Sequence, residues 1–193
     1  MNNFRAGLIA TPLQLITLFL FTCAASAQSG IERKKIFAQA ETYFLYEEYD
    51  LASQLYLQLE SPDNHNISYK IGACYVNIPD EKLKAIPYLE NAVRNIDHNA
   101  NSHLYKENRA PLDAYFYLAK AYLVNDEFDK ALSTLEKFND LAKTTKDRGG
   151  MRNPDFIDQQ IKACKNAIEL RKTPIDFTKT PLGPDFSQSP VNE

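Results

Sequence analysis

The chain has 193 residues, 44% of them hydrophobic and 24% charged, which is enough apolar material for one globular domain. Its formal net charge is −3, so it lacks the basic surplus with which nucleic-acid-binding proteins neutralise phosphates. It contains 6 glycines, too few for a β fold with many tight turns, and this favours helices.

The first 27 residues have the three parts of a secretory signal peptide. Arg5 supplies positive charge, "LIATPLQLITLFLF" is an apolar segment too short to span a membrane, and "ASA" is a small-x-small cleavage site. We expect cleavage after Ala27 and export of the mature protein. A second interpretation stays open, in which Cys23 is the acceptor cysteine of a lipoprotein, although the residue before it is larger than usual.

After residue 30, apolar residues recur with a helical period, and no stretch shows the sustained alternation of a strand. Asp80 is a plausible N-cap of the fourth predicted helix, but Pro87 would then lie too deep for its first turn. That helix should therefore either begin near Lys84 or be kinked at Pro87. The predicted helices span residues 31–49, 49–61, 66–77, 81–96, 111–125, 127–143 and 155–172.

The first six helices form three pairs with a shared spacing. In each pair a small residue is followed three positions later by a tyrosine, and 12 or 13 positions later by an alanine of the next helix. A large apolar residue follows four positions beyond that alanine. Small residues allow the two helices to approach closely, and the aromatic residues fill the space beside them. The small residues are Ala40, Gly72 and Ala119, the tyrosines Tyr43, Tyr75 and Tyr122, and the alanines Ala52, Ala85 and Ala131.

This spacing resembles the tetratricopeptide (TPR) repeat, a two-helix unit of about 34 residues. The small residues of the first and second pairs are 32 positions apart, and those of the second and third pairs are 47 positions apart. The additional residues lie in a polar loop near 96–108. The resemblance covers about residues 31–143. It implies an all-α, TPR-like right-handed solenoid of about three helix pairs, with 155–172 as a C-terminal capping helix and 28–172 as the domain.

A wider resemblance concerns the signal peptide, "YKIGACYVNIPDEKLKAIPYLENAV", "ACKNAIEL" and the proline-rich "TPIDFTKTPLGPDFSQSPVNE". Together they are similar to the N-terminal region of exported Bacteroidetes envelope proteins, in which TPR repeats precede a WD40-like propeller and an OmpA-like domain. This resemblance implies a scaffold in the periplasm or at the outer membrane, with 173–193 as a linker or tail toward a propeller. A lipid-anchored subunit or spacer of a secretion- or gliding-type assembly is the alternative.

Two cysteines remain after the signal peptide, Cys74 and Cys164, each within an I-x-A-C sequence. They have the same helical phase but lie two repeats apart, roughly 20 Å if neighbouring helices are about 10 Å apart. A disulfide requires Cα atoms within about 7 Å. We therefore expect two free, buried thiols. No histidine lies within a helical turn of Cys74, so no neighbouring base would activate it as a nucleophile.

The sequence contains no phosphate loop or Ser-His-Asp constellation, which argues against an enzyme. His65, His98 and His103 fall in loops or helix starts without a complete set of metal ligands, so neither a metal nor another cofactor is expected. An enzyme stays the third hypothesis, and a cluster of titratable groups in a closed pocket would revive it.

The remaining candidate site is the concave face, where the TPR register places the first helix of each pair. Aromatic anchors with a few polar groups would suit an extended peptide or a helix of a partner protein in the cell envelope. The competing interpretation is that the aromatic residues belong to the core. The candidate binding residues are Phe37, Glu41, Phe44, Tyr69, Asn77, Phe116, Lys120 and Leu123.

Overall fold

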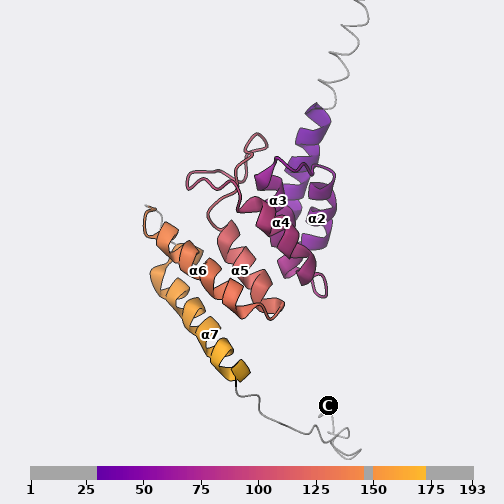
Figure 1. Cartoon of the computed structure of the whole chain (residues 1–193). Helices are drawn as coiled ribbons and strands as arrows, with labels where there is room; N and C mark the ends of the chain where they lie inside the picture. The colour runs from indigo at the N-terminus through magenta and orange to yellow at the C-terminus, as the bar shows by residue number, and fades with distance from the viewer. Residues whose placement is uncertain (1–29, 146–149, 173–193) are drawn as a thin grey trace, which may run out of the picture.

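The computed structural model describes residues 30–145 and 150–172, so the predicted signal peptide and tail lie outside the described residues. The described part is helical, with one isolated β-bridge between Ile96 and Ala110 (Figure 1). A helix over residues 30–45 comes first. It is followed by α2 (Tyr49–Leu57), α3 (His65–Asn77), the 3₁₀-helix η1 (Lys82–Lys84), α4 (Ala85–Ala92), α5 (Ala114–Val124), α6 (Phe128–Ala142), the 3₁₀-helix η2 (Gly150–Arg152) and α7 (Pro154–Lys172).

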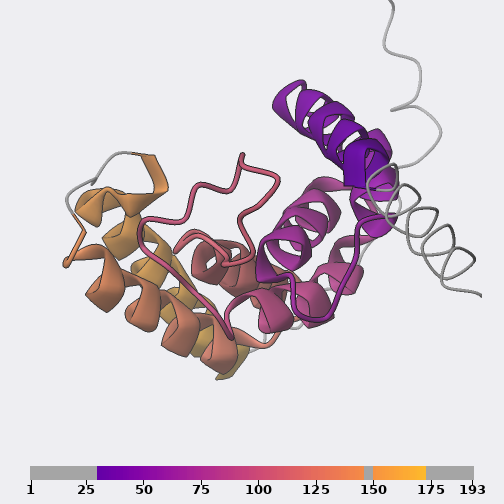
Figure 2. The same cartoon turned by 90° about the horizontal axis from the view of Figure 1, so that it is seen from above.

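The helices stack in pairs along a curved array, as the predicted all-α, TPR-like solenoid requires. The pairs are the helix over 30–45 with α2, α3 with α4, and α5 with α6, followed by α7. Because the chain reverses direction at each helix, the turns within the pairs all lie at one edge, the lower one in Figure 1. Figure 2 shows the array from above as an arc, with the connection between α4 and α5 crossing its hollow side.

The small residues of the repeat pattern are the contact points within the pairs, as predicted. Ala40 and Ala119 are fully buried. Ala85, in the helix that pairs with the helix of Gly72, is fully buried as well. A Cβ atom added to Gly72 would lie 2.4 Å from Cγ of Leu89, so only glycine allows this approach of α3 and α4. The spacing in the sequence therefore identified the helix contacts correctly.

The start of α4 corrects one expectation and confirms another. Asp80 is not the N-cap of this helix, because its φ of 62° places it in the left-handed region and η1 follows it. The α-helix begins at Ala85, which puts Pro87 in its first turn, where a missing N–H breaks no helical hydrogen bond. Of the two alternatives, the later start is confirmed.

Both cysteines are free and buried, as predicted. Burial raises the pKa of the Cys74 thiol to about 12, so it stays protonated at neutral pH. The Cys164 thiol lies 3.3 Å from the carbonyl oxygen of Phe128, to which it donates a hydrogen bond. Neither group is a candidate nucleophile. Across 30–145 and 150–172, the structure contains no helix with the length and apolar character that crossing a membrane requires.

Candidate functional site

A groove of about 670 Å³ lies between the first helix and the loop that connects α4 to α5. One wall comes from the helix over 30–45 and the turn after it, including Phe37, Phe44 and Leu45. The other wall is formed by loop residues 103–105. The exposed lining is mostly apolar, which suits a large hydrophobic side chain of a partner. We call this hollow the inner groove.

The loop wall is held in place by specific contacts. The Tyr105 ring meets Phe37 edge-to-face, with 5.8 Å between the ring centroids. At the start of α3, the Asn66 side chain donates to the carbonyl of Ser102 at 3.2 Å, and its backbone N–H donates to the carbonyl of Asn108 at 3.1 Å. These contacts fix the loop against the inner faces of the first two pairs.

A cluster of charged and polar side chains lies beneath the groove, centred on Glu41. Its carboxylate accepts a hydrogen bond from the Tyr56 hydroxyl and forms an ion pair with Lys70 at 2.7 Å. Its second oxygen lies 2.6 Å from Nδ1 of His103 in the loop. The Lys70 ammonium also sits 4.6 Å from the centre of the Phe44 ring. The Glu41 carboxylate thus links the first helix to α2, to α3 and to the loop between α4 and α5.

Burial opposes the charge on both members of this ion pair. Desolvation would raise the pKa of the Glu41 carboxyl, but the Lys70 ammonium, with hydrogen bonds from Lys70, Tyr56 and His103, lowers it overall. Burial lowers the pKa of Lys70, and Glu41 offsets part of that effect. The charged pair therefore persists because each member compensates the other.

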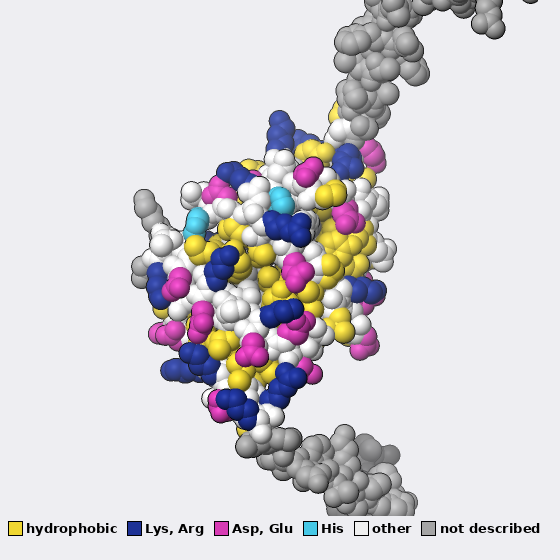
Figure 3. All heavy atoms as spheres, viewed as in Figure 1, with side chains coloured by type: hydrophobic (Ala, Val, Ile, Leu, Met, Phe, Trp, Pro, Cys, Tyr) yellow, Lys and Arg dark blue, Asp and Glu magenta, His cyan; other side chains and the backbone are white. Residues whose placement is uncertain are grey.

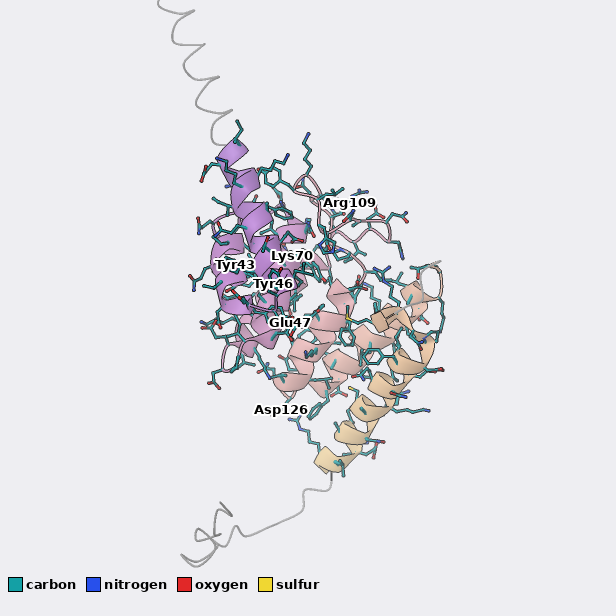
Figure 4. All side chains as sticks on the ribbon, turned by 180° about the vertical axis from the view of Figure 1, so that it is seen from behind. Tyr43, Tyr46, Glu47, Lys70, Arg109 and Asp126 are labelled. Carbon is teal, nitrogen blue, oxygen red and sulfur yellow. The ribbon has the colours of Figure 1, made fainter. Side chains whose placement is uncertain are left out.

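This cluster is a structural element and not the closed catalytic pocket that would revive an enzyme. Lys70 is 1% exposed, and its ammonium is enclosed by Glu41 and the face of Phe44. Figure 4 shows Lys70 in the middle of the molecule and Arg109 toward one end. A substrate in the groove would meet the edge of Glu41 and the exposed His103 but could not reach the amine.

The structure separates the predicted binding residues into three groups. Phe37, Glu41 and Phe44 line the inner groove together. Phe37 is only 3% exposed and Tyr69 only 6%, so for these two rings the competing interpretation, that they belong to the core, is correct. Tyr69 packs against Tyr117 of α5, with 5.8 Å between the ring centroids, and its ring is therefore covered.

The last four predicted residues lie farther along the array. Lys120 of α5 donates to the side-chain oxygen of Asn77 at 3.2 Å and so links α5 to the end of α3. Leu123 is half-buried on the same helix. The Phe116 ring is half-buried and packs 5.6 Å from Phe156 of α7, between centroids. Partner binding by these side chains stays a prediction.

Sequence reasoning missed the loop residues His103, Leu104 and Tyr105, and the buried Lys70. The stretch "DHNANSHLYKENRA" is polar, and its apolar pair Leu104–Tyr105 was the only local signal that part of it is packed. No local pattern in the sequence marks Lys70 as buried. Its burial follows from Glu41, 29 positions earlier, which no local pattern reveals.

The face drawn in Figure 3 has no large patch of a single charge sign, and the described residues form no candidate metal cluster. Figure 3 shows basic and acidic side chains mixed with apolar ones on the face seen in Figure 1. Within the described ranges, no three His, Cys, Asp or Glu side chains are grouped so that they could hold a metal ion.

Comparison with known proteins identifies the fold. No protein-family model matches the sequence, and no curated protein matches it. Among solved structures, the chain is similar to the Sgt2 TPR domain from Aspergillus fumigatus, with 18% identity and a TM-score of 0.53. The match covers 80% of this chain and 93% of that domain. At this identity the likeness shows the fold alone: the chain is an all-helical solenoid of the TPR type.

Proposed function

We propose that this chain is a non-catalytic protein–protein interaction scaffold that docks a peptide or helix of a partner protein in the inner groove. One observation carries the proposal: an apolar hollow of about 670 Å³ on the inner side of a helical array, with exposed Leu45 and Leu104 on its two walls. Large apolar side chains that stay exposed around a concave surface are typical of an interaction site.

The occupant of this groove should be short. The loop that forms one wall also covers α3, whose residues Asn66 to Val76 are all buried. An extended peptide therefore cannot continue from the first helix pair onto the second, as it could in an open concave face. One or two large apolar side chains would fill the hollow.

Two groove variants test the proposal without disturbing the core. Leu45 and Leu104 are 77% and 56% exposed, so Leu45→Asp with Leu104→Asp should leave folding unchanged and abolish partner recovery in a pull-down from an envelope extract. Ile31→Asp is the matched control, because Ile31 is exposed on the same first helix outside the groove lining. Unchanged recovery with the double variant would refute the groove assignment.

We further propose that the scaffold is exported and works in the cell envelope, in the periplasm or at the outer membrane. The support is the sequence of residues 1–27 and the resemblance of the repeat region to envelope proteins. Mass spectrometry of the mature N-terminus tests it. A chain that begins at Gln28 supports the exported form, a diacylated Cys23 supports the lipid-anchored spacer, and an intact Met1 contradicts both.

A further inference from the structure

The edge formed by the turns within the helix pairs has an unusual composition, apart from the inner groove. It comprises residues 45–51, 79–84 and 124–129, with the end of α7 beside the third turn, and we call it the turn edge (Figure 1). Arg171 of α7 donates to the carbonyl of Asp126 at 3.0 Å, which fixes that position. Residues of the second and third turns together line a hollow of about 570 Å³.

Exposed apolar side chains are concentrated at this edge. The described part of the chain has eight large hydrophobic residues that are exposed, and six of them lie here. Scattered exposed apolar residues are normal on a protein surface, but their gathering on one edge marks an interaction surface. The six are Leu45, Tyr46, Leu51, Leu83, Val124 and Leu170.

The same edge carries an excess of negative charge. Glu81 and Glu127 are paired with Lys84 and Lys130. Six other carboxylates have no basic partner within ion-pair distance in the described ranges, against two basic side chains without a carboxylate partner, Lys82 and Arg171. Figure 4 shows Glu47 and Asp126, two of the six, and Arg109 away from them toward the opposite end. The six are Glu47, Glu48, Asp50, Asp80, Asp126 and Asp129.

We infer that the turn edge docks a basic amphipathic segment of a partner protein, with large apolar side chains on the exposed Tyr46, Leu83 and Val124 and Lys or Arg opposite the unpaired carboxylates. Charge complementarity selects this occupant. A second copy of the chain would bring the same acidic edge and a net charge of −3, so like charges would repel. An anionic lipid surface would be repelled for the same reason.

The turn edge adjoins the inner groove at Leu45 and Glu47, which belong to both surfaces, but the variants made at the turn edge share no residue with the groove variants. The probe is a synthetic amphipathic helix with leucines on one face and lysines on the other, whose binding is followed by fluorescence anisotropy at about 0.1 M salt. Charge reversal at the turn edge, Glu48→Lys with Asp129→Lys, should weaken binding at least about tenfold, because exposed charge pairs act over about 10 Å at 0.1 M salt. The matched control is Glu60→Lys with Asp63→Lys, in the connection at the opposite edge, which should change affinity less than about twofold.

A second pair of variants tests the apolar half of the surface. Tyr46→Ser with Leu83→Ser should weaken binding by a similar factor, whereas Ile31→Ser, exposed on the first helix outside both surfaces, should not. A peptide with glutamates in place of the lysines should not bind. Equal losses for the edge and control charge variants would show a net-charge effect and overturn the proposal. The absence of binding at about 1 mM peptide would also overturn the proposal, because the binding free energy would then be weaker than about −4 kcal/mol.

Discussion

Helices α3 and α7 share the sequence I-x-A-C but differ sharply in their surroundings. In α3 eleven consecutive residues, Asn66 to Val76, are buried, whereas α7 buries only Ile157, Ile161 and Cys164 among its described side chains. The isoleucine and cysteine of the motif are inside in both helices. The alanine between them is buried in α3 as Ala73 and exposed in α7 as Ala163.

The difference comes from the number of neighbours. Helix α3 contacts α2, α4 and α5, and the loop after α4 covers its inner face, while α7 packs against α6 at the described end of the array. The second position of the motif reflects the difference in packing, because it is Gly72 in α3 and Lys162 in α7. Glycine is required where Leu89 packs on the helix, and lysine is tolerated where that face is exposed. A short motif therefore specifies the face that its helix must bury, and the neighbours determine the rest.

The largest expected difference in stability between the surroundings of α3 and α7 follows from removing a charge beside the inner face of α3. Glu41→Ala would leave the Lys70 ammonium buried without its partner, and breaking such a pair costs about 3–5 kcal/mol. The matched change beside α7 is Glu136→Ala, which breaks an exposed pair with Lys165 at 3.6 Å and should cost less than about 1 kcal/mol. Urea denaturation measures both free energies of unfolding.

A double variant separates the charge effect from lost packing. Glu41→Leu with Lys70→Met replaces the ion pair with apolar side chains of similar size and should recover most of the stability. A double variant as unstable as Glu41→Ala would show that lost packing or hydrogen bonds, and not the unpaired charge of Lys70, cause the loss of stability.

The pH dependence of the same pair gives the second prediction. The pKa of Glu41 in the folded protein lies below its ordinary value of 4.5, so the carboxylate stabilises the fold above that pH, and this stabilisation is lost as the pH falls through the folded pKa. Near neutral pH, Glu41→Gln should lower the free energy of unfolding by about 2–3 kcal/mol, less than Glu41→Ala because an amide still accepts hydrogen bonds. The gap between the Glu41→Gln variant and the wild-type protein should narrow below pH 4.5, and a constant gap would contradict the assignment.

The close approach at Gly72 gives the third prediction. Gly72→Ala places a methyl group against Leu89, and such overpacking costs about 1–3 kcal/mol, offset in part by the better helix propensity of alanine. We expect a net loss of about 1–2 kcal/mol in urea denaturation. At the corresponding exposed position of α7, Lys162→Ala should change the stability by less than about 0.5 kcal/mol. Equal effects would mean that α3 is no more tightly packed than α7.

These residues also show how far the sequence predicts the structure. The spacing of Ala40, Gly72 and Ala119 was sufficient for the helix pairs, because close helix contacts require small residues at a fixed period. The register of a long polar loop depends on contacts with residues far away in the sequence, such as Tyr105 with Phe37, and has no periodic signal. For that reason the sequence predicted the helix pairs but not the packing of the loop against Phe37, nor the burial of Tyr69 against Tyr117 of α5.

The smallest expected effect concerns the two cysteines. The Cys74 thiol makes no hydrogen bond within the described residues, whereas the Cys164 thiol donates to the carbonyl of Phe128. Cys74→Ser would bury a hydroxyl that must find a partner within its own helix, at a cost of about 1 kcal/mol. Cys164→Ser keeps a donor beside an existing acceptor and should cost less than about 0.5 kcal/mol. If urea denaturation gave the reverse order, a serine at position 164 would not keep the hydrogen bond to the carbonyl of Phe128, and that bond would not explain the difference between the two cysteines.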